Sequence, residues 1–201
     1  MNKKIMIFAL ASLMLASCGL RDPKRDAALT IKERTDISAA EESAAPDGGA
    51  DYGITANAFE LTSADLVDGV WSDDITDTQY GTNSSPQLKW ASVEGAQLYS
   101  IYMVDTTAGN WLHWKTGEVT ETELAHGWAE RDDYVGPYPP DGTHTYEVFV
   151  FALKQPADKY EGLFNSSNAS LEDMFASVDT AGGERGNIIS YGHISGTYTA
   201  K

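Results

Sequence analysis

Three segments of this chain have the composition of long β-strands, and they constrain the fold more than any other feature. Residues 97–104, 111–119 and 144–153 are rich in aromatic and branched side chains and contain no proline. Such side chains pack well on a pleated surface. Stretches rich in Gly, Pro, Asn and Asp lie between the segments and favour turns. The sequence therefore predicts a mainly β fold.

One helix is expected near the end of the chain. Ser170 followed three residues later by Asp173 resembles a capping box with Asp in the Glu position. Four apolar residues then recur at helical spacing, namely Leu171, Met174, Phe175 and Val178. Their shared face predicts a helix that packs on a core.

The first eighteen residues are typical of an export signal that ends in a lipidated cysteine. Lys3 and Lys4 precede an apolar run that is too short to span a bilayer comfortably. Residues 15–18 (LASC) resemble the lipobox of bacterial lipoproteins. Cys18 is the only cysteine, so no intrachain disulfide can form. We expect residues 1–17 to be cleaved and Cys18 to carry acyl chains, palmitate among them.

Residues 18–50 are expected to tether that lipid to a folded domain. The stretch 39–50 is small, polar and almost free of large apolar side chains, so it buries too little surface to offset its ordering entropy. The resemblance to Gram-negative lipoproteins implies that an Asp directly after Cys18 would favour retention in the inner membrane, and this chain has Gly19 there. We therefore expect a protein of the bacterial cell envelope, on the outer membrane in a Gram-negative cell.

Residues 51–201 are expected to form one domain, and its charge excludes some partners. The domain holds 7 of the 14 Lys and Arg residues and 23 of the 30 Asp and Glu residues, and so the whole net charge of −16. Because phosphate backbones require a basic surface, nucleic acid is excluded as a partner. Membrane attachment is expected through Cys18, and protein partners are not indicated.

A small polar site is suggested by strand alternation. Side chains two residues apart on a strand point to the same face, which pairs His144 with Tyr146 and Trp111 with His113. The same rule turns Leu112 and Trp114 together to the other face.

Six segments, in order, resemble the phosphatidylethanolamine-binding protein family, which includes the Raf kinase inhibitor-like proteins of bacteria. They are residues 59–63 with 68–69 (FELTS, DG), 83–90 (NSSPQLKW), 104–108 (VDTTA), 111–114 (WLHW), 134–142 with 144–146 (YVGPYPPDG, HTY) and 196–198 (GTY). The family has D-P-D-A-P where this chain has 105–109, so the second Asp and both prolines are replaced. The arginine that often follows that motif is also missing.

This resemblance implies an antiparallel β-sheet fold with a second small sheet and one or two short helices. It also implies a non-catalytic pocket for a small phosphate-like anion, without a cofactor. Carried over residue by residue, the ligand-binding residues are Asp105, Trp111, His113, Pro139, Pro140, His144 and Tyr146. An imidazole N–H can donate to an anion, and Asp105 could fix the tautomer.

Other functions stay open from the residues alone. Asp105, His113 and His144 could form a 2-His-1-carboxylate site for iron or zinc in a metalloenzyme. The five Trp and ten Tyr residues, all within 51–201, could serve a surface module for glycan binding or adhesion. A serine hydrolase is not indicated, because no G-x-S-x-G sequence is present.

Overall fold

The computed structural model describes residues 56–201. The signal segment 1–17, Cys18 and the tether 18–50 therefore lie outside the described residues, as do residues 51–55. No helix within residues 56–201 has both the length and the apolar character needed to cross a membrane.

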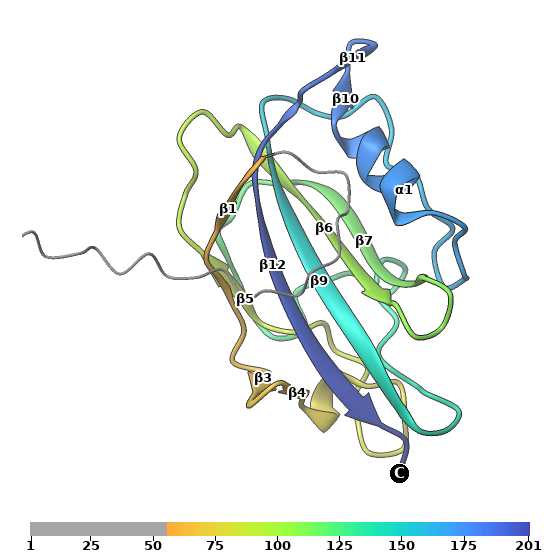
Figure 1. Ribbon diagram of the computed structural model, residues 1–201. Helices are drawn as coiled ribbons and strands as arrows, with labels where there is room; N and C mark the ends of the chain where they lie inside the picture. Colours follow the sequence, from red (N-terminus) through yellow and green to blue (C-terminus); the bar gives the residue numbers. More distant parts are fainter. Residues whose placement is uncertain (1–55) are drawn as a thin grey trace, which may run out of the picture. The chain divides into compact units, whose positions relative to one another are not determined.

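A curled seven-stranded sheet forms the centre of the domain (Figure 1). Its strand order is β3-β4-β12-β9-β6-β7, and β1 also pairs with β12. The bounds are β1 Asn57–Phe59, β3 Leu66–Val67, β4 Val70–Trp71, β6 Leu98–Asp105, β7 Trp111–Val119, β9 Thr143–Leu153 and β12 Ile188–Thr199. The three expected strands are confirmed as β6, β7 and β9, side by side.

The sheet is mixed rather than wholly antiparallel. β12, β9, β6 and β7 pair antiparallel in that order, whereas β1 and β4 both run parallel to β12. The two parallel strands have two or three residues each, and their pairing is non-local. The expectation of an antiparallel sheet therefore holds for the long strands.

Two small sheets and two short helices complete the fold. One small sheet has the order β2-β5-β8, and the other pairs β10 with β11. Their bounds are β2 Leu61–Thr62, β5 Leu88–Trp90, β8 Glu123–Leu124, β10 Thr180–Ala181 and β11 Glu184–Arg185. A 3₁₀ turn, η1, covers Asp73–Ile75, and the helix α1 covers Leu171–Val178. The Ser170 side chain accepts a hydrogen bond from the Asp173 backbone N–H at 3.0 Å, which confirms the expected helix start.

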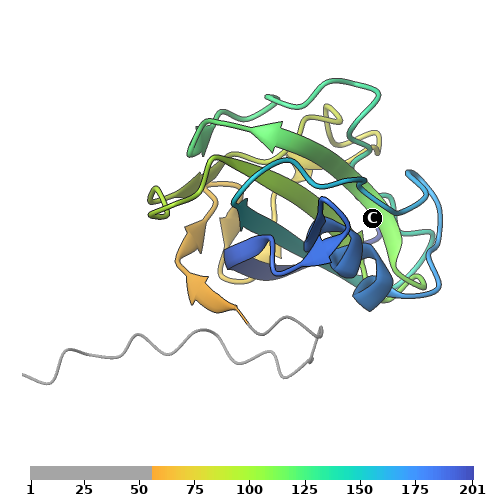
Figure 2. The same ribbon diagram turned by 90° about the horizontal axis from the view of Figure 1, so that it is seen from above.

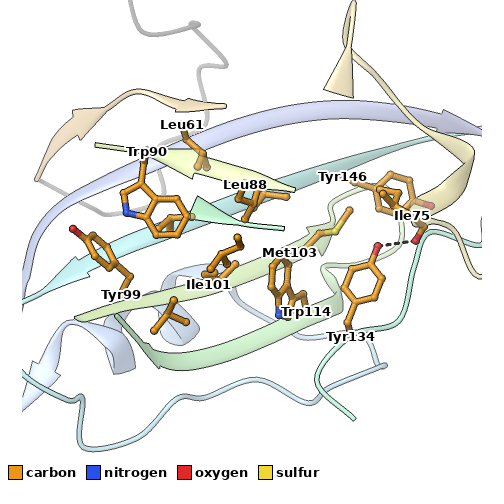
Figure 3. Packing of buried hydrophobic residues seen from close by; sticks show 14 of the residues in the cluster. Leu61, Ile75, Leu88, Trp90, Tyr99, Ile101, Met103, Trp114, Tyr134 and Tyr146 are labelled. Atoms are coloured by element: carbon orange, nitrogen blue, oxygen red, sulfur yellow. Dashed lines mark hydrogen bonds between the residues drawn. The ribbon is translucent and has the colours of Figure 1, made fainter. Parts of the chain in front are cut away.

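The large sheet buries both faces. On one face Ile101, Met103 and Val148 pack with Leu61, Leu88 and Trp90 from the small β2-β5-β8 sheet (Figure 3). On the other face Tyr102, Phe149 and Phe151 pack with Met174, Phe175 and Val178 of α1, which lies beside the sheet (Figure 2). We call these the small-sheet face and the helix face. Alternation along β6 and β9 assigns successive residues to opposite faces.

A β-bulge in β7 breaks that alternation. Met103 pairs with Trp114, but the next residue, Val104, pairs with Leu112, so His113 is an extra residue in the strand. Leu112 consequently packs on the helix face and Trp114 on the small-sheet face. The prediction that Leu112 and Trp114 share a face is therefore wrong, because a bulge shifts the register by one residue.

Candidate functional site

The ends of β6, β7 and β9 bring four of the expected site residues together. Asp105 is the last residue of β6, and it pairs with Trp111, the first residue of β7. On its other side Asp105 pairs with Tyr146 of β9. His144 lies two residues before Tyr146 and so points to the same face. That face is the small-sheet face, which includes Tyr146 itself.

The bulge gives His113 a place in the same site. His113 is 2% exposed, and its Nδ1 lies 2.8 Å from the carbonyl oxygen of Val135. The Val135 N–H in turn donates to the carbonyl oxygen of His113 at 2.8 Å. Since a carbonyl can only accept, Nδ1 carries the ring proton. Burial lowers the pKa of His113 below its ordinary value, and the Val135 contact opposes this only in part.

Asp105 accepts three hydrogen bonds that hold the polar groups of the site in place. It is 2% exposed, and its Oδ1 accepts the backbone N–H groups of Thr107 and Ala108 at 2.9 and 3.1 Å. Its Oδ2 accepts from His144 Nδ1 at 2.6 Å. The altered 105–109 segment thus still holds this carboxylate, and it fixes the tautomer of His144 as suggested from the residues.

Thr107 also connects this loop to β9, which sequence reasoning missed. Its hydroxyl oxygen accepts the backbone N–H of Thr145 at 3.0 Å, and Thr106 N–H donates to the carbonyl of Thr145 at 3.0 Å. In the sequence, Thr107 is noticeable only because it replaces the second Asp of the family's D-P-D-A-P motif. Nothing in the local pattern pointed to Thr145 as its partner.

The Tyr146 hydroxyl is buried and makes no hydrogen bond of regular geometry among the described residues, and the Asp105 carboxylate lies near it. Burial and then the nearby Asp105 carboxylate raise its pKa far above the ordinary value, so the phenol keeps its proton. The Tyr146 ring lies 5.2 Å from the His113 ring and 6.4 Å from the His144 ring, measured between centroids. A buried hydroxyl without a regular hydrogen bond is uncommon and calls for an explanation.

These residues surround one cavity of about 240 Å³. Its lining residues are Asp105, Ala108, Trp111, His113, Tyr138, Pro139, Pro140, His144 and Tyr146. All seven residues expected to bind the ligand are among them. Ala108 and Tyr138 are additional, although Tyr138 lies within the 134–142 segment that carried the family resemblance.

Asn165 holds the rim of the cavity together. Its Oδ1 accepts from Trp111 Nε1 at 3.1 Å and from the Tyr138 hydroxyl at 2.9 Å. The Trp111 and Tyr138 rings stand perpendicular, with centroids 6.3 Å apart. Asn165 is 54 residues from Trp111 along the chain, so no sequence signal could have identified this role.

The geometry does not favour the two alternative functions. No group of three or more His, Cys, Asp or Glu residues in the described part of the chain could hold a metal ion, and Val135 occupies His113 Nδ1. The glycan-binding hypothesis needs exposed rings. Within residues 56–201, Trp71, Trp90 and Trp114 are buried, the other two tryptophans are partly buried, and only Tyr80 is an exposed tyrosine.

A larger groove of about 620 Å³ lies beside α1. Its lining includes both acidic and basic residues, namely Lys159, Glu161, Asp173 and Arg185. None of the residues singled out from the sequence for ligand binding belongs to it. The cavity at the ends of β6, β7 and β9 is therefore the candidate site.

Comparisons with known proteins agree with the sequence resemblance. A family model described as phosphatidylethanolamine-binding protein matches residues 62–199. Twelve chains of solved structures also match, whereas no curated protein does.

Two of those structures illustrate the likeness. One is a phosphatidylethanolamine-binding protein homologue, CT736, from Chlamydia trachomatis D/UW-3/CX, with 23% identity, a TM-score of 0.56, and coverage of 73% of this chain and 100% of that chain. The other is YbcL from E. coli, described as a new member of the mammalian PEBP family, with 24% identity, a TM-score of 0.55, and coverage of 71% and 99%. At this identity the likeness shows the fold alone.

Proposed function

Because the chain belongs to the phosphatidylethanolamine-binding protein family, we propose that it is a lipid-anchored binding protein whose cavity takes a small phosphate-like anion without catalysis. The family fold supports a ligand-binding protein in general terms. The ligand class and the membrane anchor go beyond that.

The observation that carries the ligand class is the Tyr146 hydroxyl, which is buried at the cavity beside the Asp105 carboxylate and makes no hydrogen bond of regular geometry among the described residues. A neutral phenol is a hydrogen-bond donor, and an oxyanion is an acceptor that such a buried donor can bind. The ring of His144 supplies a second polar group, because Asp105 binds its Nδ1 and leaves Nε2 for a ligand. The cavity volume of about 240 Å³ is slightly below the roughly 300–1,000 Å³ of drug-sized ligand sites, which suits a small ligand.

The cavity walls also suit a group attached to a larger molecule. Trp111, Pro139 and Pro140 are only partly buried or exposed, and they border the polar end formed by Asp105, His113 and His144. A phospho-headgroup could place its charged end at these polar groups and its remainder against the apolar border. Free phosphate would use the polar end only.

Binding is tested by titration with inorganic phosphate and with phosphoethanolamine. Replacing His144 with alanine should weaken binding by roughly 1.5–3 kcal/mol, because it removes a ring from the polar end of the cavity and leaves Oδ2 of Asp105 without its donor. His126→Ala is the matched control, because His126 pairs with Asp65 at 3.1 Å and does not line the cavity. Equal binding in the parent and His144→Ala would remove the site from the proposal.

The membrane anchor rests on residues 1–18 of the sequence. Two or three acyl chains at roughly 0.8 kcal/mol per buried methylene would hold the protein firmly, whereas the acidic domain would not adhere to anionic lipids by itself. Cys18→Ala should abolish labelling by radioactive palmitate and release the protein from the membrane fraction or leave an uncleaved precursor. A Cys18→Ala protein that matures and fractionates like the parent would contradict the anchor.

A further inference from the structure

The charged residues that line the cavity are unusual for an anion site. Among the described residues that line it, one is a carboxylate and none is lysine or arginine. Asp105 is 2% exposed, so solvent screens its negative charge poorly. An entering anion would meet this charge without a permanent cation to offset it. Only His113 and His144 can supply positive charge within the lining.

The hydrogen bonds of the two histidines also leave few donors for an anion. His144 donates from Nδ1 to Asp105, and His113 donates from Nδ1 to the Val135 carbonyl. In a neutral imidazole with the proton on Nδ1, the other nitrogen, Nε2, presents a lone pair. Neither Nε2 atom would then have a proton to donate to an oxyanion, and Tyr146 would be the one neutral donor among these three side chains. A proton on Nε2 converts repulsion into a charge-assisted hydrogen bond.

His113 is the histidine best placed to gain that proton. It is neutral in the free protein near pH 7, because burial lowers its pKa. Nδ1 of His144 already binds the Asp105 carboxylate at 2.6 Å, whereas Nδ1 of His113 binds only an uncharged carbonyl. A bound anion would supply the missing partner for a positive His113.

We propose that the cavity binds a fully ionised oxyanion together with one proton, and that Nε2 of His113 takes up this proton. The inference rests on the proposed function, since it concerns the same cavity. The proton bonds to the Nε2 lone pair, and no other bond forms or breaks. Solvent supplies the proton, so binding weakens as the pH rises.

The groups that face His113 come from three directions. Asp105 from β6 favours its positive form, and His144 from β9 opposes it. Tyr138 and Tyr146 line the same cavity as neutral phenols. Farther groups act on these tyrosines, with Asp77 near Tyr138 and Tyr198 near Tyr146. Asp105 is thus the one carboxylate in the lining, and a bound sulfate would add two negative charges near His113.

Sulfate is the probe that tests this proposal, because its charge does not change between pH 5 and 8, whereas inorganic phosphate titrates in that range. The full domain is titrated with sulfate by calorimetry at several pH values. Uptake of one proton predicts that the dissociation constant rises about tenfold per pH unit above the pKa of His113. Sulfate affinity that is independent of pH in the parent protein would overturn the proposal.

His113→Asn assigns the proton. Asparagine can place an N–H donor near the position of Nδ1, toward the Val135 carbonyl, but it does not titrate. In His113→Asn the dissociation constant for sulfate should change little with pH, whereas His126→Asn should keep the parent's rise of about tenfold per pH unit. A slope that persists in His113→Asn would place the proton elsewhere and refute the assignment.

Nuclear magnetic resonance of the parent protein gives a second readout that needs no variant. Adding sulfate at constant pH above 7 should shift the ring nitrogen signals of His113 toward the imidazolium form, and unchanged signals at saturation would refute the proposal. If phosphate binds but sulfate does not bind at any pH, the proton comes from the ligand and the inference fails while the proposed function stands. If neither anion binds, the proposed function itself fails.

Discussion

Replacing Asp105 with asparagine should loosen the polar end of the cavity by a calculable amount. The carboxylate accepts two backbone N–H groups on Oδ1, at 2.9 and 3.1 Å, and His144 Nδ1 on Oδ2, at 2.6 Å. Asparagine keeps one carbonyl oxygen for the two backbone donors. Its amide NH₂ then replaces Oδ2, so a donor faces the donor of His144.

The number of hydrogen bonds lost sets the expected change in the free energy of unfolding. One charge-assisted hydrogen bond is lost in a buried setting, which should lower the free energy of unfolding by about 1.5–3 kcal/mol. With a urea dependence of roughly 2 kcal/mol per molar, the unfolding midpoint should fall by about 1 M. The His144 ring can recover part of this if its proton moves to Nε2 and Nδ1 accepts from the new amide.

Urea unfolding and nuclear magnetic resonance of the His144 ring check the two parts of the prediction. Asp132→Asn, at an exposed position, removes the same charge and serves as the control. An unchanged urea midpoint in Asp105→Asn, together with a His144 proton that stays on Nδ1, would contradict the prediction.

Three further predictions concern the stability of the fold. The pKa of His113 is depressed in the folded protein, so the unfolded chain binds more protons at low pH. The free energy of unfolding should therefore fall as the pH drops below about 6.5. Urea midpoints at pH 7.5 and 5.5 should differ less in His113→Asn than in the parent. Gly136→Ala should destabilise the domain by about 1–3 kcal/mol, since the added Cβ would overlap the Ile75 carbonyl oxygen; a melting temperature equal to that of the parent would contradict the close backbone approach. Ser170→Ala should lower stability by about 1 kcal/mol through loss of the helix cap, and Ser170→Asp, which can still cap, should retain most of it.

Local patterns in the sequence determined the elements that carry the site. β7 runs from Trp111 to Val119 as expected, and α1 begins after Ser170. The shared face of His144 and Tyr146 followed from strand alternation, which depends only on the geometry of one extended chain. The ordered family motifs extended this prediction to Asp105, because they reflect a whole fold rather than one segment.

Only the tertiary structure decided how His113 and the rim are held. The bulge at His113 depends on the pairing of β7 with β6, and it lets His113 reach the cavity while Trp114 fills the core. A period-two pattern cannot reveal such an extra residue, since the register is set by both strands and their packing. The same holds for Val135 against His113, Thr107 against Thr145, and Asn165 between Trp111 and Tyr138. Each joins residues at least 22 positions apart, and a contact between distant residues leaves no trace in the local sequence because it is formed only when the strands have paired.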